Sequence, residues 1–280
     1  SIDTIQLSTP SLWQSGGTVR QRTNVVVAEY HQSGGTWLST TLPVSIGTYA
    51  MTNGEFRGEG LTVTNFAWYD GGINRDGNGS APVLRVPPGG QFLMKGSATR
   101  SYSTYNGNLP GHIVNQGAAS WEGGTLSANF FSTFENAGSL AITAPASVAY
   151  GGFGSGPRFV NSGVVTAATN VTFSSVNFLN SGQWNAAAGT FVSSASNFTN
   201  RGVLNLTSAS LLHLDSGAAY LDGTVTAPAP DSLRFRGADV SIDTIQLSTP
   251  SLWQSGGTVR QRTNVVVAEY HQSGGTWLSA

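Results

Sequence analysis

A short motif recurs along the chain at a spacing of about twenty residues. It consists of an apolar or aromatic residue, any residue, Asn, Gln or Asp, any residue, and glycine. From Gly117 to Gly217 the motif occurs six times, so one repeat spans about 20 residues on average. A period of this length is typical of solenoids, in which each repeat buries its apolar face against its neighbours. The polar positions are Gln14, Gln32, Asp70, Asn115, Asn136, Asn161, Asn180, Asn200 and Asp215. The glycines are Gly16, Gly34, Gly72, Gly117, Gly138, Gly163, Gly182, Gly202 and Gly217.

Each repeat divides into short runs with the periodicity of β-strands. In residues 163–181, apolar residues occur at Val164–Val165, from Val171 to Val176 and at Phe178. They alternate with polar residues at two-residue spacing, which favours strands over helices. No segment carries the start and stop signals of a helix of ten or more residues. The sequence therefore predicts an all-β parallel β-helix, a β-solenoid with about twenty residues and three short strands per coil.

The repeating geometry of such a coil assigns a role to each motif residue. Asn and Gln at the corners of stacked coils can hydrogen-bond to one another along the axis. The glycine that follows can adopt the positive φ of a tight turn. We therefore expect the polar positions to form a corner ladder and the glycines to form the turns.

A second repeat is exact. Residues 1–39 recur without a change at 241–279, a period of 240 residues. We expect 1–240 to be one tandem unit of about twelve coils, and 241–280 to be the start of the next unit, continuous with the same solenoid. An artificial duplication of the chain ends is the alternative.

The corner motif resembles the haemagglutinin-type and autotransporter-type repeats of bacterial surface β-helices. Residues 159–165 (FVNSGVV), 178–184 (FLNSGQW) and 198–217 carry the likeness best. It covers 113–217 well and 1–40 moderately. The resemblance implies an elongated extracellular or cell-surface protein that serves adhesion or surface structure. Together with the 240-residue period, it suggests a large tandem-repeat fibre protein.

Composition excludes several other classes of protein. Charged residues make up 10% of the chain and the net charge is −1, too little basic charge to neutralise many phosphates of a nucleic acid or an anionic membrane. No apolar run reaches the length of a membrane-spanning helix. Cysteine is absent, so disulfides and thiolate metal sites are excluded. We expect no cofactor.

The stretch 73–112 interrupts the motif, because more than two coil lengths separate Gly72 from Gly117. We expect an irregular insertion there. One interpretation is a plain insertion, and the other is a recognition loop or lateral fibre contact that includes Tyr102 and Tyr105. Four nearby oxygen-bearing residues are candidate calcium ligands. They are Asp70, Asp76, Asn78 and Ser80. The alternative is a simple cluster of Asx turns, which is favoured because Pro87 stands where an EF-hand has its glutamate.

The acidic residues decide between an enzyme and a binding or structural protein. Some β-helix enzymes cleave polysaccharides with paired carboxylates on adjacent coils. Here Asp215 and Asp222, and likewise Glu122 and Glu135, are separated by well under one coil length. Neither pair therefore has the offset that would place both acids on one face of neighbouring coils. We expect no catalytic residues.

Histidines and tryptophans also have two readings. The histidines His31, His112 and His213 lack any triad context, which favours structural roles. The tryptophans Trp13, Trp37, Trp68, Trp121 and Trp184 are expected mainly in the core, with a sugar-stacking face as the alternative.

Three functions follow from these observations. The first is a segment of a long structural fibre whose partners are further copies of itself. The second is an adhesin that binds a glycan or a surface protein. The third is a polysaccharide lyase or tailspike-like hydrolase, which the scattered acids disfavour.

Overall fold

All secondary-structure elements in the described part of the chain are β-strands. The computed structural model describes residues 7–21, 24–39, 44–75, 83–104, 111–129, 131–152, 156–243 and 246–279. They form two units: unit 1 comprises Ser1–Leu140 and Tyr150–Pro157, and unit 2 comprises Ala141–Ala149 and Arg158–Ala280. The boundary passes through β15 (Ser139–Tyr150). The described residues include no helix long and apolar enough to cross a membrane.

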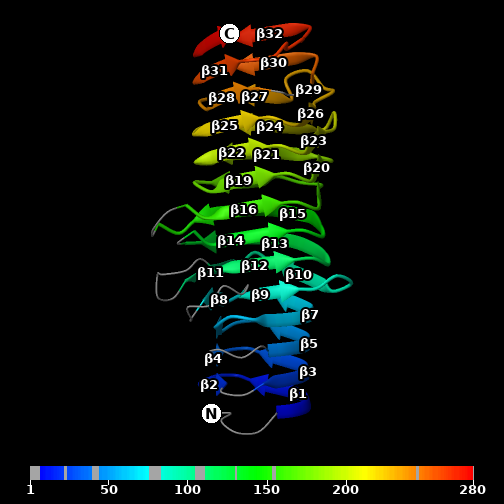
Figure 1. The fold of residues 1–280 in the computed structure, drawn as a ribbon, viewed down its shortest axis with the longest axis vertical. Helices are drawn as coiled ribbons and strands as arrows, with labels where there is room; N and C mark the ends of the chain where they lie inside the picture. Colours follow the sequence, from blue (N-terminus) through cyan, green and yellow to red (C-terminus); the bar gives the residue numbers. More distant parts are fainter. Residues whose placement is uncertain are drawn as a thin grey trace. The chain divides into compact units, whose positions relative to one another are not determined.

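Unit 2 consists of three ladders of parallel strands. Within each ladder the strands are stacked one above another, from β16 to β33 (Figure 1). The first ladder contains β16 (Arg158–Asn161), β19 (Asn177–Asn180), β22 (Asn197–Asn200), β25 (Ala218–Leu221), β28 (Asp239–Ile242), β31 (Thr258–Gln261) and β33 (Thr276–Ser279). The second contains β17 (Val164–Ala167), β20 (Gln183–Ala186), β23 (Val203–Leu206), β26 (Thr224–Thr226) and β29 (Gln246–Ser248). The third contains β18 (Val171–Ser174), β21 (Gly189–Ser194), β24 (Ser210–Leu214), β27 (Leu233–Phe235), β30 (Ser251–Gln254) and β32 (Glu269–Gln272).

The register along the first ladder gives the coil length directly. One row of paired positions runs through Phe159, Phe178, Phe198, Ala219, Val240, Val259 and Trp277. Each step along this row therefore adds about twenty residues, the length expected of one solenoid repeat. Each of the first five coils takes one short strand from every ladder. The predicted parallel β-solenoid is confirmed, and these coils have the predicted three strands each.

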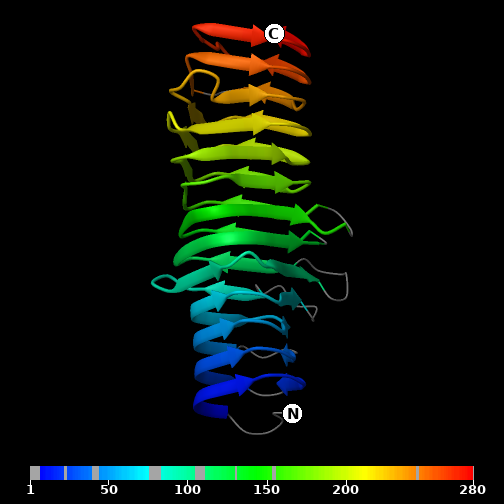
Figure 2. The same ribbon diagram turned by 180° about the vertical axis from the view of Figure 1, so that it is seen from behind.

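Unit 1 is also a parallel solenoid, and its long strands are coloured blue to cyan in Figure 2. The first ladder contains β1 (Leu7–Gln14), β3 (Val25–Gln32), β5 (Val44–Met51), β7 (Leu61–Trp68), β10 (Gln91–Lys95) and the start of β13 (Ala118–Ala128). The second contains β2 (Thr18–Gln21), β4 (Thr36–Ser39), β6 (Glu55–Arg57), β8 (Gly72–Arg75), β11 (Thr99–Thr104) and the end of β13. A third, which branches from β7, contains β9 (Leu84–Val86), β12 (His112–Asn115) and β14 (Thr133–Asn136).

The coils of unit 1 differ from the predicted three-strand pattern in one respect. Strands β3, β5 and β7 are long and skip one pairing position each, at Ala28, Gly47 and Thr64. These sequences contain no corner motif between the two halves of the strand, so nothing interrupts it. At Gly47 a Cβ would lie 2.6 Å from the Ala28 carbonyl oxygen, so the residue also allows close approach of neighbouring coils.

The stretch 73–112 is more regular than predicted. Strands β9, β10 and β11 lie within it and join the ladders of unit 1, so they form a coil of their own over 84–104. The expected irregular insertion is therefore interrupted by a regular coil. Residues 76–82 and 105–110 of the stretch lie outside the described residues.

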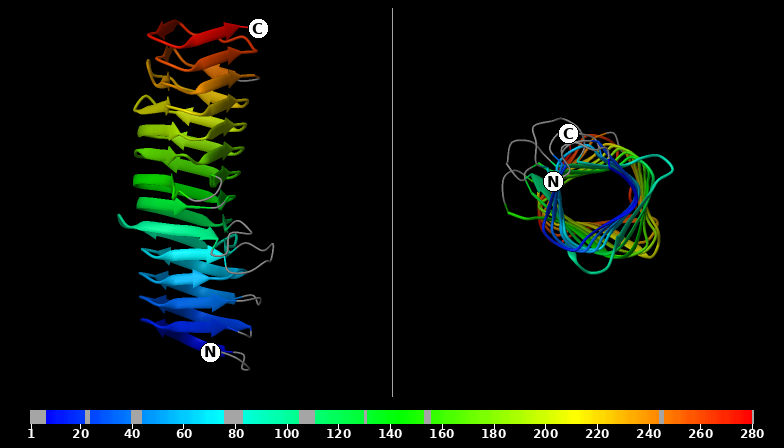
Figure 3. Two further views of the ribbon diagram at one scale, coloured as in Figure 1. Left: turned by 90° about the vertical axis from the view of Figure 1, so that its left-hand side faces the viewer. Right: turned by 90° about the horizontal axis from the view of Figure 1, so that it is seen from below.

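In each unit the strands surround an interior (Figure 3). The buried side chains that fill it are mainly aromatic and aliphatic. In unit 2, the ring of Phe178 stacks on those of Phe159 and Phe198, with centroids 6.1 and 4.8 Å apart. In unit 1, the rings of Tyr30, Tyr49, Phe66 and Phe92 follow one another at 4.8, 5.1 and 5.2 Å. Because each coil contributes to the same row, no coil buries its apolar side chains alone.

Candidate functional site

The corner asparagines of unit 2 form a buried carboxamide ladder. Asn161, Asn180 and Asn200 end β16, β19 and β22, and each is fully buried. The Asn161 Nδ2 donates to Asn180 Oδ1 at 2.7 Å, and Asn180 Nδ2 donates to Asn200 Oδ1 at 2.7 Å. Each amide also donates to a backbone carbonyl of the next coil, as Asn180 does to Val203 O at 3.0 Å. The ladder therefore holds side chain and backbone of successive turns together.

The same arrangement occurs in unit 1 between β12 and β14. Asn115 Nδ2 donates to Asn136 Oδ1 at 2.8 Å and to Ser139 O at 3.1 Å. Both asparagines are fully buried. A buried amide without partners would cost about 1–3 kcal/mol, so these contacts are what makes the buried corner stable.

Gln14 and Gln32 form a different cluster, on the first ladder of unit 1. Their Oε1 atoms accept hydrogen bonds from the hydroxyls of Tyr30 and Tyr49, respectively. Gln32 Nε2 donates to Gly35 O at 3.1 Å and to Glu55 O at 3.2 Å, which ties two turns together. Burial raises the pKa of both tyrosines, so the hydroxyls stay protonated and act as donors. The expected single ladder is thus at least two separate polar clusters.

Asp70 and Asp215 lie outside both clusters. Gln32 is in register with Met51 and then Trp68, so Asp70 falls in the turn beyond the strand and accepts a hydrogen bond from Gly71 N at 2.6 Å. Asp215 follows β24 in the same way, and its Oδ1 lies 3.4 Å from Arg236 Nε. Both are partly exposed, unlike the corner asparagines.

The role predicted for the motif glycines needs a correction. Gly217 has the expected positive φ of 78°, but Gly138, Gly182 and Gly202 do not have a positive φ. At these three positions a Cβ would lie 2.0 to 2.1 Å from a carbonyl oxygen of the preceding coil. Glycine is required there because the coils approach closely.

The other motif glycines lie in bends between strands, apart from Gly72, which begins β8, but they too lack the predicted positive φ. At Gly16 and Gly34 the positive φ belongs to the next residue, Gly17 or Gly35, and Gly72 follows the positive-φ residue Gly71. Gly117 has no positive φ either, and its Cβ would lie 2.2 Å from Gly90 O. Gly163 likewise has no positive φ.

The candidate calcium and recognition residues are only partly placed by the structure. Asp76, Asn78, Ser80 and Tyr105 lie outside the described residues. Within the described residues, no group of three or more His, Cys, Asp or Glu side chains could hold a metal ion. Tyr102 is fully buried and pairs between Ile73 and Ala128, so it belongs to the core and not to an exposed recognition loop.

Tryptophans and histidines are likewise sorted by burial. Four of the tryptophans expected in the core have no exposed surface: Trp37, Trp68, Trp121 and Trp184. Trp13 is 74% exposed, and its ring stacks on His31 with centroids 4.1 Å apart.

The other two histidines contact charged side chains. His112 Nε2 lies 2.9 Å from Glu135 Oε2. The pKa of His213 is lowered by its burial and by Arg236, whose Nη1 lies 3.1 Å from the ring, while Asp215 opposes the shift.

The carboxylates considered for catalysis also face cations. Glu122 lies 3.8 Å from Lys95 Nζ, and Asp222 lies 3.7 Å from Arg201 Nε. Each of these acids therefore has a charge partner on a neighbouring coil.

One buried residue, Arg100 in β11, was not predicted from the sequence. Its side chain is fully buried and donates to the carbonyls of Trp68 at 2.8 Å and Gly123 at 3.1 Å, and to that of Lys95. Desolvation lowers the pKa of the guanidinium, and Asp70 opposes this. Arg100 is therefore a polar cross-link between coils. An isolated arginine between threonine and serine gives no signal of this role in the sequence.

The two copies of the 39-residue repeat form the same contacts in different units. Tyr30 donates to Gln14 Oε1 in unit 1, and Tyr270 donates to Gln254 Oε1 at 2.5 Å in unit 2. Trp37 Nε1 donates to Gln21 Oε1 at 3.3 Å, and Trp277 Nε1 donates to Gln261 Oε1 at 3.0 Å. The identical sequence therefore forms the same side-chain contacts at both places, although residues 25–28 belong to β3 and the equivalent residues 265–268 form no strand.

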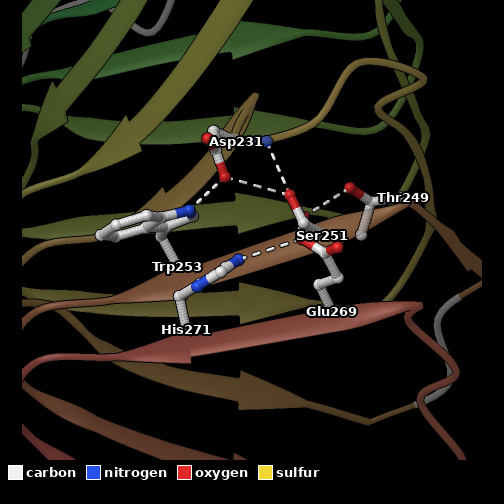
Figure 4. Close-up of polar contacts among 6 residues, drawn as sticks. All are labelled: Asp231, Thr249, Ser251, Trp253, Glu269 and His271. Atoms are coloured by element: carbon white, nitrogen blue, oxygen red, sulfur yellow. Dashed lines mark hydrogen bonds and ion pairs between the residues drawn. The ribbon is translucent and has the colours of Figure 1, made fainter.

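The second copy is held to the preceding coil by Asp231 (Figure 4). Asp231, with a φ of 60°, accepts hydrogen bonds from Trp253 Nε1 and, at 3.1 Å, from Ser251 Oγ. Its own backbone N–H donates to Ser251 Oγ at 2.7 Å. On the next strand His271 stacks on Trp253, with ring centroids 4.8 Å apart. Ser251 is 1% exposed, whereas Ser11, the same residue of the first copy, is exposed.

Comparison with known proteins finds no relative of this chain. No protein-family model matches the chain, and the curated proteins and solved structures also give no match.

Proposed function

We propose that the chain is one period, together with the start of the next, of a structural fibre built from tandem 240-residue repeats. The observation that carries the proposal is the junction of the two repeats. Residue 240 and residue 241 lie inside one strand, β28, which pairs with β25 before it and β31 after it. The last coils of one period therefore lead into the first coil of the next without a break in the ladder.

The contacts between successive coils suit a mechanical role. Backbone hydrogen bonds along each ladder, the buried carboxamides and the shared aromatic rows all connect one coil to the next. A protease cleaves only locally unfolded backbone. Opening one coil here also breaks its contacts with the coils on both sides, which makes such opening costly. We accordingly propose a stiff, protease-resistant filament, extracellular or at a cell surface as the likeness of the corner motif suggests.

The experiment is to express chains with one, two and three 240-residue periods and to measure particle length by electron microscopy. Twelve coils at about 4.8 Å add roughly 58 Å per period, so the particles should lengthen in equal steps of that size. Separate particles joined by thin linkers would contradict a continuous fibre. Particles of constant length would contradict it as well.

A further inference from the structure

The two copies of the repeat differ in how much of the same coil is covered. In unit 1, Tyr30 and Trp37 have no exposed surface, and Val27 is 1% exposed. In unit 2, the equivalent Tyr270 is 39% exposed, and Val267 and Trp277 are partly exposed. The sequence is the same in both copies, but two features around it differ. The first copy has a further coil on this side, and residues 265–268 of the second copy form no strand, whereas the equivalent residues 25–28 belong to β3 and pair with β1.

In unit 1 the covering coil consists of β5 and β6. Tyr30 is in register with Tyr49, and Trp37 is in register with Phe56. The Tyr49 hydroxyl donates to Gln32, and Gln32 Nε2 donates to Glu55 O at 3.2 Å. Backbone hydrogen bonds continue between the strands, from Thr52 N to Gln32 O and from Glu55 N to Gly35 O, both at 2.9 Å.

In unit 2 the same side of the second copy has no covering coil among the described residues. Strand β32 pairs only with β30, and β33 pairs only with β31. Gln272, the equivalent of Gln32, donates to Gly275 O at 2.9 Å within its own turn. The result is an unpaired sheet edge bordered by Tyr270 and by Leu278, which is 47% exposed.

We propose that this edge, formed by β32 and β33, is the docking face for a coil with the sequence of residues 44–57, supplied by the following repeat of a longer chain. The proposal rests on the proposed function and specifies its register: the counterpart of Tyr49 lies on Tyr270 and donates to Gln272, and the counterpart of Phe56 lies on Trp277. The first copy supplies the template, because the same residues already bind that segment in unit 1.

The opposite side of the repeat supports the same conclusion. Asp231 holds Ser251 and Trp253 of the second copy. In the first copy, Ser11 is exposed and Trp13 is 74% exposed. One side of the repeat is therefore covered in the first copy, and the opposite side is covered in the second copy. Together the two copies show the repeat with a neighbouring coil on each side.

The chain has no cysteine, so single thiols can report the covering of each copy. Val27→Cys and Val267→Cys place a small apolar side chain at equivalent positions. In the 280-residue chain, Cys at 267 should react with a maleimide at least about tenfold faster than Cys at 27, because a buried thiol reacts only through local opening. When residues 40–75 are appended after Ser279, the rate at 267 should fall to that at 27.

A matched extension separates the register from mere added length. In it, the counterparts of Tyr49 and Phe56 are replaced by serine, and the thiol at 267 should stay reactive. An unchanged rate at 267 with the natural extension would overturn the docking face. Equal protection by both extensions would also overturn it. The short extension does not depend on whole repeats, so protection here alongside separate particles in electron microscopy would retain the docking face and reject the continuous fibre.

Discussion

Asn180→Ala is expected to lower the free energy of unfolding of unit 2 by roughly 2–5 kcal/mol. The change removes the acceptor of Asn161 Nδ2 and the donor to both Asn200 Oδ1 and Val203 O. All three asparagines are fully buried, so water does not replace the lost partners, and each unsatisfied group costs about 1–3 kcal/mol. Urea unfolding followed by tryptophan fluorescence measures the loss.

Asn197→Ala is the matched control for this prediction. Asn197 Nδ2 also donates to an asparagine of the preceding coil, Asn177 Oδ1, at 2.8 Å, but this pair is exposed. Water can satisfy the amide there, so the change should stay within about 0.5 kcal/mol. Losses of equal size for the two variants would show that the buried ladder contributes no more than a surface contact.

Gly202→Ala is expected to destabilise unit 2 by about 3 kcal/mol or more. The new Cβ would lie 2.0 Å from Gly182 O, a backbone atom that cannot move aside. The coils must separate, which adds overpacking strain to the weakening of the 2.8 Å hydrogen bond from Val203 N to Gly182 O. The midpoint of thermal unfolding, followed by circular dichroism, should fall accordingly.

Gly16→Ala tests whether any glycine of the motif would give the same result. Nothing lies within 4 Å of a Cβ at Gly16, and its φ is not positive. Alanine should therefore be neutral or stabilise unit 1 by up to about 1 kcal/mol, since it reduces the freedom of the unfolded chain. A loss at Gly16 comparable to that at Gly202 would contradict the account of close approach.

The part of the structure that follows from the sequence is the part that every coil repeats. The segments around Asn161, Asn180 and Asn200 carry the same motif one coil length apart, and the structure places them in register. The pattern predicts the ladder there because each coil meets the same neighbour. Phe159, Phe178 and Phe198, two residues before each asparagine, share a row for the same reason.

The side-chain contacts that the sequence did not indicate depend on which coils become neighbours on the other faces of the solenoid. Gln14 and Gln32 match the motif, yet they accept hydrogen bonds from tyrosine hydroxyls and not from asparagines. The reason is that the next coil in each case carries a tyrosine, Tyr30 or Tyr49, two residues before its own corner position. Arg100 finds its carbonyl partners on other coils, at Trp68 and Gly123. The requirement for glycine at 182 and 202 likewise arises from the spacing between coils, which a single coil does not reveal.

The most direct test of the account is a disulfide across the junction of the two repeats. Tyr220 in β25 is in register with Ser241 in β28, the first residue of the second copy. Parallel strands lie about 4.8 Å apart, within the span of about 4.4–6.8 Å that a disulfide allows between Cα atoms. The pair Tyr220→Cys and Ser241→Cys should therefore form a disulfide under mild oxidation. Tyr220→Cys with Asp239→Cys, two residues out of register and about 8 Å apart, should not. Cross-linking of the out-of-register pair, or failure of the in-register pair, would contradict a solenoid that continues from one repeat into the next.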